Sequence, residues 1–148
     1  MTERRPNYVG IIAGAIVMFA FGAVWYTALG AAWLAAIGKS PAELNAAMTT
    51  PVFVPYVISF VAALLVAYCF DNMLWHYERA DAAKGVQVGF LTGICIYASM
   101  LLTLYSFAVR PFSLFLIDGG YGVIGFLITG AVVGALRGRM SRRAAART

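Results

Sequence analysis

The chain has 148 residues, of which 62% are hydrophobic and only 11% are charged, and its formal net charge is +5. Soluble globular domains carry about 25% charged residues and rarely expose large apolar patches, so this composition excludes a soluble globular domain. The charges stand in short clusters between long uncharged runs. That pattern is typical of membrane proteins and argues against binding to nucleic acid.

Four uncharged runs are long enough to cross a bilayer. A helix needs about 20 apolar residues to cross a hydrocarbon layer of ~30 Å. The apolar residues are continuous, whereas a barrel strand would alternate apolar and polar residues over about ten positions. The sequence therefore predicts an all-α fold, a single four-helix transmembrane bundle with spans at about 8–29, 53–76, 86–108 and 113–136.

The first span, 8–29, follows the basic pair Arg4-Arg5 and ends near the aromatic pair Trp25-Tyr26. A basic start followed by an apolar run is also the pattern of a secretory signal peptide. Such a peptide has a shorter apolar core of roughly 7–15 residues. We therefore expect the segment to be retained as the first helix of the bundle.

The longest connection, about 30–51, follows the first span. Ser40-Pro41-Ala42-Glu43 has the form of a capping box with proline at the first helical position, which predicts a short helix over 41–48. Gly38 is typical of the residue that ends a helix, so it predicts the end of the preceding helical segment.

Glycine gives the clearest packing signal. Two rows with a spacing of four lie at the inner ends of the third and fourth spans and extend just beyond them: Gly85, Gly89 and Gly93, and Gly130, Gly134 and Gly138. Such rows form a glycine-zipper face that lets helix backbones approach closely. We expect the two faces to pack against each other or against the first helix, which carries Gly10 and Gly14. A homodimer interface is the alternative.

The basic residues predict the orientation. Four spans place the N-terminus, the 77–85 loop and the basic tail 137–148 on one side of the membrane. That side carries Arg4, Arg5, Arg79, Lys84, Arg137, Arg139, Arg142, Arg143 and Arg147, whereas the other carries only Lys39 and Arg110. The positive-inside rule places the first side in the cytoplasm. We expect a bacterial inner-membrane protein with both termini cytoplasmic.

Ionisable side chains within spans are costly in a bilayer, so they are functional candidates by default. Asp118, near the outer end of the fourth span, is the strongest candidate, and Arg110 lies on the same side of the membrane. Asp118 either serves a ligand or a proton, or it is structural and caps the helix or binds Arg110 or a tyrosine hydroxyl. Aromatic residues near the outer end form either an aromatic belt or the wall of an outward-opening cleft.

A second polar group is expected at the inner face, from Asp71, Asn72, His76 and Gln87. Asp71 and Asp118 lie near opposite membrane faces, so they cannot form the carboxylate pair of a hydrolase. The chain has one histidine, and no cluster of histidine, cysteine and carboxylate residues has metal-ligand spacing. The sequence therefore predicts no metal site and no cofactor.

Several segments together carry a family resemblance: Asn7-Tyr8, Gly22-Ala23-Val24-Trp25-Tyr26, Trp33 with Gly38, Leu116-Ile117-Asp118-Gly119-Gly120-Tyr121, and Gly130-Ala131-Val132-Val133-Gly134. Over most of residues 7–136 the chain resembles an uncharacterised, mostly bacterial membrane family, domain of unknown function 1761. The resemblance implies a four-helix membrane protein and no particular activity. We expect Trp25, Tyr26, Asp118 and Tyr121 to form one outer cluster, with Trp25 within ~12 Å of Asp118.

These features favour a non-enzymatic structural or accessory subunit. A small transporter or channel that uses Asp118 and Arg110 at its outer mouth is the first alternative. It requires a polar path that continues past Thr129 or Thr92 toward Asp71. A lipid-interacting enzyme is the second alternative. The expected partners are membrane lipids, a second copy of the chain or a larger membrane complex.

Overall fold

The structure, a computed structural model, describes residues 5–145 of the chain, without the side chains of residues 141 and 143–145. Arg4 and Arg147, which belong to the charge bias of the sequence, lie outside these residues, as does the rest of the basic tail after residue 145. The side chain of Arg143, which is one of the basic residues counted for the orientation, is also not among those that the structure describes.

The described chain is all-helical and contains four helical spans that are long and apolar enough to cross a membrane, which confirms the predicted fold class. The elements are α1 (Tyr8–Ile37), α2 (Pro41–Ala47), α3 (Phe53–Trp75), α4 (Ala82–Thr92), the π-helix η1 (Gly93–Ala98), α5 (Ser99–Phe107) and α6 (Phe112–Ala145). The third span runs without a break through α4, η1 and α5. The protein is therefore an integral membrane protein by length and composition.

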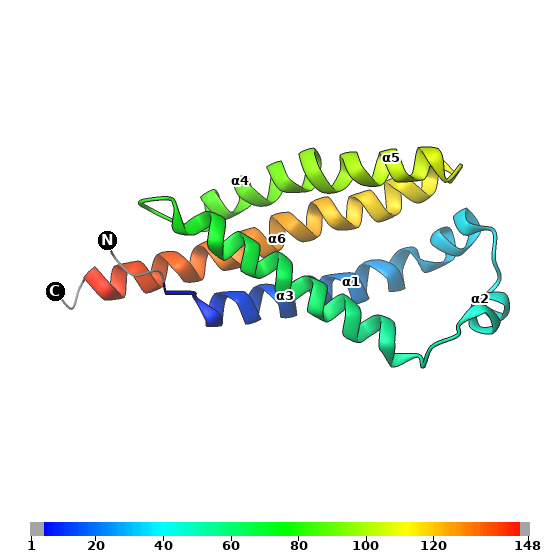
Figure 1. Cartoon of the computed structure of the whole chain (residues 1–148), viewed down its shortest axis with the longest axis horizontal. Helices are drawn as coiled ribbons and strands as arrows, with labels where there is room; N and C mark the ends of the chain where they lie inside the picture. The colour runs from blue at the N-terminus through cyan, green and yellow to red at the C-terminus, as the bar shows by residue number, and fades with distance from the viewer. Residues whose placement is uncertain (1–4, 146–148) are drawn as a thin grey trace.

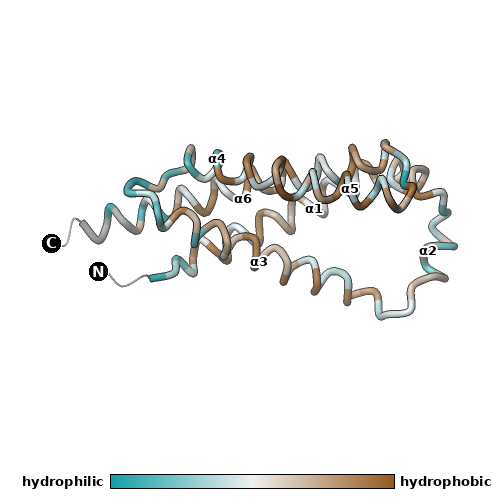
Figure 2. The backbone as a smooth tube through the Cα atoms, turned by 45° about the horizontal axis from the view of Figure 1, so that its top comes forward, coloured by the Kyte–Doolittle hydropathy of each residue, from teal (hydrophilic) through white to brown (hydrophobic). Residues whose placement is uncertain are grey.

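The start of α1, the end of α6 and the connection between α3 and α4 lie together at one end of the bundle, the terminal end (Figure 1). Helix α2 and the connection between α5 and α6 lie at the opposite end, the distal end. Hydrophilic residues gather at these two ends, and the helices between them are mostly apolar (Figure 2). This distribution matches four crossings of a hydrocarbon layer.

Two helices extend further than the sequence predicts. Helix α1 continues past the predicted end of its span at about residue 29, because residues 31–37 are good helix formers. It ends at Ile37, where Gly38 stops it with a φ of 69°, as the sequence predicts. Helix α6 continues to Ala145, whereas the prediction ends it at about residue 136. Residues 137–145 are helical because arginine, alanine and methionine have high helix propensity.

Helix α6 is the centre of the bundle, since it contacts α1, α3, α4, η1 and α5. Its closest neighbour is α4. A Cβ atom at Gly85 would overlap the carbonyl of Gly130, and one at Gly134 would overlap the carbonyl of Asp81. The two glycine rows thus lie against each other, and the backbones of α4 and α6 approach more closely than any larger residue would permit.

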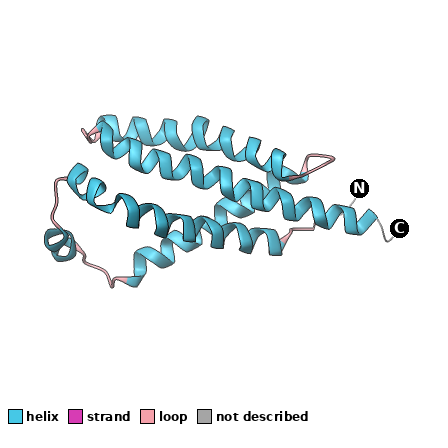
Figure 3. Ribbon diagram, turned by 180° about the vertical axis from the view of Figure 1, so that it is seen from behind, coloured by secondary structure: helices cyan, strands magenta, loops and turns pink. Residues whose placement is uncertain are grey.

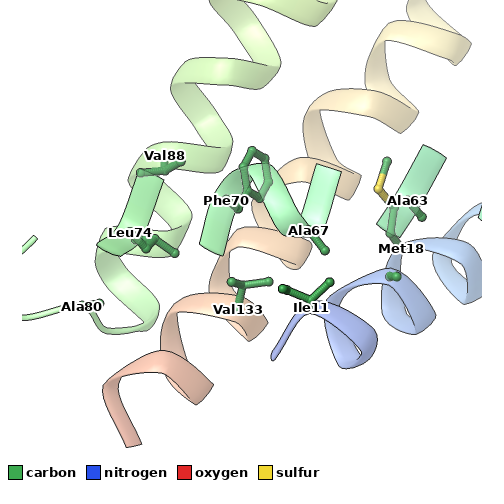
Figure 4. Close-up of a cluster of buried hydrophobic side chains, with 10 residues drawn as sticks. Ile11, Met18, Ala63, Ala67, Phe70, Leu74, Ala80, Val88 and Val133 are labelled. Carbon is green, nitrogen blue, oxygen red and sulfur yellow. The ribbon is translucent and has the colours of Figure 1, made fainter. Parts of the chain in front are cut away.

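The apolar core lies in the terminal half of the bundle (Figure 4). Helices α1 and α3 supply most of the core, and α4, the loop before it and α6 supply the rest. The core residues are Ile11, Ala15, Met18, Ala63, Ala67, Phe70, Leu74, Ala80, Val88 and Val133. Gly14 of α1 also packs here, because a Cβ at that position would lie 3.3 Å from Ala67 Cβ. Small residues therefore bring α1, α3 and α6 together at the same depth.

Helices α1 and α3 diverge toward the distal end and are joined there through α2 (Figures 1 and 3). Helix α2 begins with a complete capping box, in which Glu43 N–H donates to Ser40 Oγ and Ser40 N–H donates to Glu43 Oε2. These bonds from Ser40 lower the pKa of the exposed Glu43 carboxyl. Because that pKa falls on folding, the cap contributes stability at neutral pH that is lost in acid.

Candidate functional site

The site is built around the carboxylate of Asp118 in α6, which two tyrosine hydroxyls hold from two other helices. Tyr26 of α1 donates to Oδ1 over 2.7 Å, and Tyr105 of α5 donates to Oδ2 over 2.6 Å. Asp118 is only 8% exposed. Hydrogen bonds to an ionised acceptor are short and strong, so these two bonds tie the first, third and fourth spans together near the distal end.

Two more aromatic side chains bond the backbone of α6 at the same level. The indole Nε1 of Trp25 donates to the carbonyl of Ile117 over 3.1 Å, and the hydroxyl of Tyr97 donates to the carbonyl of Asp118 over 3.2 Å. The Trp25 ring reaches the backbone because Gly120 has no side chain; a Cβ there would lie 3.2 Å from the ring. Trp25 and Asp118 are thus neighbours, as the outer-cluster hypothesis requires.

Tyr121 completes the aromatic surroundings of the site. Its ring lies 5.2 Å from that of Tyr26 and stacks on Phe21 with a centroid distance of 5.9 Å. Tyr26 also meets Trp33 edge to face at 6.3 Å. The structure therefore places Trp25 and Tyr26 beside Asp118, and it packs Tyr121 against Tyr26.

The π-helix η1 explains why Tyr97 faces this site. In an α-helix a residue turns about 100°, so a row with a spacing of four drifts by about 40° at each step. A π-turn is wider and reduces that drift. Tyr97 therefore continues the face of Gly85, Gly89 and Gly93, and its ring occupies the space that Gly122 leaves open on α6. No signal in the sequence predicts the π-turn.

Arg110 lies near Asp118 but does not pair with it. Both line a cavity of about 280 Å³ at the distal end, and no ion pair joins them among the residues described. The other polar lining residues are Lys39 and Tyr105, and the apolar wall consists of Trp33, Ile37, Leu44 and Leu114. The cavity thus combines one carboxylate and two cations with apolar walls from α1, α2 and α6.

A different arrangement holds Asp71 near the terminal end. Its carboxylate forms a buried ion pair with Arg137 of α6, and Oδ2 accepts a bond of 3.2 Å from the backbone N–H of Asn7. The guanidinium of Arg137 also stacks over the Trp75 ring at 5.1 Å. The sequence predicts Arg137 in a basic tail outside the bundle, so this pair is not expected from the sequence.

The predicted inner-face cluster does not form around Asp71. The hydrogen bonds of Asp71 go to Arg137 and Asn7, while Gln87 accepts from Lys84 over 3.2 Å on an exposed surface. His76 is exposed at the end of α3, and Asn72 is only partly buried. Among the described residues, no hydrogen bond joins Asn72, His76 or Gln87 to Asp71.

A model of one protein family, "Protein of unknown function (DUF1761)", matches residues 9–134. The chain belongs to this family. The match covers both the Trp25-Tyr26 pair and the segment from Asp118 to Tyr121, whereas Asn7 and Arg137 lie outside it. Neither the curated proteins nor the solved structures contain a match to this DUF1761 protein.

The two buried carboxylates of this DUF1761 protein differ in how their charge is compensated. Asp71 has a guanidinium beside it, whereas Asp118 has two hydroxyl donors and, within the described residues, no paired cation. An ionised carboxylate has about four lone-pair sites, and the tyrosines occupy one on each oxygen. Asp118 can therefore accept further hydrogen bonds from a donor in the cavity.

Proposed function

We propose that this DUF1761 protein is a non-enzymatic, multi-pass protein of the bacterial inner membrane that binds a ligand in the distal cavity. The observation that carries the proposal is the carboxylate of Asp118, which lies within a span and on the wall of a cavity, without an ion-pair partner in the described chain. A buried charge is costly unless it is paired. A ligand that supplies a donor or a cation would lower that cost.

Asp71 provides the comparison within the same molecule. There the bundle compensates a buried carboxylate with its own arginine and closes the site, since Asp71 is fully buried and Arg137 is 2% exposed. Asp118 instead borders open space together with two cations, Lys39 and Arg110. The contrast favours a structural role for the first carboxylate and a binding role for the second.

The orientation that we propose places the distal cavity at the outer face of the membrane. Among the described basic side chains, Lys39 and Arg110 belong to the distal end, whereas the terminal end carries Arg5, Arg79, Lys84, Arg137, Arg139 and Arg142. Short loops rich in lysine and arginine stay in the cytoplasm. The ligand would therefore reach the cavity from the outer leaflet or from the solution outside the cell.

Binding fits the interior of the bundle better than conduction does. A transporter or channel would need polar groups between Asp118 and Asp71. That region contains the apolar core, with Met18, Ala67 and Phe70 buried in it. Thr129 is buried there as well, and Thr92 donates its hydroxyl to the Val88 carbonyl of its own helix.

A structural or accessory subunit is the second candidate. This candidate is favoured because all four side-chain carboxylate oxygens of Asp71 and Asp118 accept hydrogen bonds from other residues of the bundle. In that case Asp118 would only fasten α1 and α5 to α6, and the protein would act through a larger membrane complex. Stable co-purification of the same partner with wild-type protein and with a variant that has a filled cavity would favour this candidate.

The test uses Leu44→Trp, which fills the cavity from α2, and Asn45→Trp, its exposed neighbour, as the matched control. Native mass spectrometry of the full chain, released from detergent micelles after extraction from membranes, would detect a retained small molecule or lipid. We expect the adduct in wild-type protein and in Asn45→Trp, and its loss in Leu44→Trp. The same occupancy in all three proteins, or no adduct in any, would contradict ligand binding in the cavity.

A further inference from the structure

The distal cavity presents charges of both signs beside an apolar wall. Asp118 supplies the negative charge, and Lys39 and Arg110 supply two positive charges on exposed, hydrated side chains. A simple anion would satisfy the cations and leave the carboxylate unpaired, whereas a simple cation would do the reverse. A ligand that carries both a cationic and an anionic group matches the whole lining.

The geometry around Asp118 selects the type of cation. Each tyrosine hydroxyl occupies one lone pair on a carboxylate oxygen, through bonds of 2.7 and 2.6 Å. These two bonds fix the orientation of the carboxylate, and therefore the directions of its remaining lone pairs. A primary ammonium group has three N–H donors for such acceptors, whereas a quaternary ammonium group has none. Because an ammonium group that donates to both oxygens also neutralises the charge, the site favours a primary amine.

The two cations suit an oxyanion such as a phosphate. A guanidinium binds the oxygens of a phosphate in a bidentate manner, and a lysine ammonium adds a point charge. Arg110 is held in place through its backbone, since its N–H donates to the Tyr105 carbonyl over 2.9 Å. The chain thus fixes the position of Arg110 relative to Tyr105, the residue that also holds Asp118.

The apolar wall indicates that the ligand comes from the membrane. Trp33, Ile37 and Leu114 belong to the ends of membrane-spanning helices, where tryptophan favours the interface between lipid and water. We propose that the cavity binds the head group of an aminophospholipid, with its primary ammonium on Asp118 and its phosphate on Arg110 and Lys39. This inference rests on the proposed function, because it names the ligand of the same cavity.

The experiment measures lipid binding to the full chain in detergent micelles by native mass spectrometry. Phosphatidylethanolamine, phosphatidylglycerol and phosphatidylcholine with the same acyl chains are added in turn. Wild-type protein should bind phosphatidylethanolamine about tenfold more tightly than either of the others. Asp118→Asn should lose this preference, and Arg110→Gln should weaken binding of all three lipids about tenfold. Arg79→Gln, on the loop at the terminal end, is the matched control and should change neither.

Two results would overturn the inference. One is equal affinity of wild-type protein for phosphatidylethanolamine and phosphatidylglycerol. The other is an unchanged preference in Asp118→Asn together with unchanged affinities for all three lipids in Arg110→Gln. Should Asp118→Asn fail to fold, Arg110→Gln and the wild-type ranking still decide the question. Free phosphoethanolamine should compete only weakly, and competition as strong as that of the lipid would show that the ligand is soluble.

The failure of this inference is distinguishable from that of the proposed function. If Leu44→Trp removes an adduct that has no preference for a primary amine, the cavity binds a ligand but the aminophospholipid assignment is wrong. If Leu44→Trp binds every lipid as wild-type protein does, the cavity is not the binding site and both proposals fall.

Discussion

Asp71 and Arg137 are 66 positions apart in the chain, yet they form a fully buried ion pair between α3 and α6. The backbone N–H of Asn7 bonds the same carboxylate, so the pair also fixes the start of α1. Three of the four spans therefore meet at one charged group near the terminal end. Near the distal end, the hydrogen bonds of Tyr26 and Tyr105 to Asp118 join a different set of three spans, the first, third and fourth.

The Asp71–Arg137 pair should tolerate joint replacement better than single replacement. Removal of one partner leaves an uncompensated buried charge, which costs about 3–5 kcal/mol. We expect Asp71→Asn and Arg137→Gln each to lower the free energy of unfolding in micelles by that amount. The double variant should lose less than either single variant, since it buries no charge. Strictly additive losses in circular dichroism unfolding curves would show that the two side chains are not coupled.

Contact between α4 and α6 should depend on glycine. We expect Gly89→Leu and Gly134→Leu to disrupt the bundle, because a Cβ at either position would overlap a backbone carbonyl of the other helix. Gly30→Leu is the matched control, since nothing lies within 4 Å of the Cβ position at Gly30. Size-exclusion chromatography and thermal unfolding in detergent would separate the outcomes. Wild-type behaviour of the Gly89 and Gly134 variants would count against the close packing.

The hydroxyls on Asp118 should each contribute measurably to stability. A hydrogen bond to a charged group contributes about 1.5–3 kcal/mol, so we expect Tyr26→Phe and Tyr105→Phe to destabilise the protein by that amount. Tyr56→Phe removes the hydroxyl of a tyrosine that is 61% exposed and should have no effect. In an Asp118→Asn background the losses should shrink. Losses of the same size in both backgrounds would mean that the hydroxyls stabilise something other than the carboxylate.

Val109 should be a site of removable backbone strain. Its φ of 53° lies in the left-handed region, which costs a residue with a Cβ about 1–2 kcal/mol and costs glycine little. We expect Val109→Gly to raise the free energy of unfolding by about 1 kcal/mol. Ala108→Gly, whose φ of −79° is ordinary, should lower it slightly instead. A lower thermal midpoint for Val109→Gly than for wild-type protein would refute the assignment of strain.

Hydrophobic patterning was sufficient to predict the four spans, because each is a long run without charge and bilayer thickness sets its length. The same patterning placed the ends of α1 and α6 too early. Hydrophobic patterning measures how apolar a segment is. A helix continues beyond the apolar segment wherever the next residues favour helix, as residues 138–145 do.

The distal cluster could be predicted only in part. Trp25, Tyr26 and Asp118 were expected together from the family resemblance and from their common depth. The role of Tyr105 could not be predicted, because it depends on how far α5 is rotated after the π-turn in η1. The pairing of Arg137 with Asp71 depends on tertiary packing between helices that are distant in sequence, for which one sequence carries no signal.

In the topology that we propose, four spans place the distal cavity at the outer face of the membrane. Single cysteines at Asn45 and Arg142, in a chain with Cys69→Ala and Cys95→Ala, allow a direct test with a membrane-impermeant thiol reagent. In intact spheroplasts Asn45→Cys should react and Arg142→Cys should react only after lysis. Labelling of Arg142→Cys in intact spheroplasts, with Asn45→Cys protected, would contradict the account.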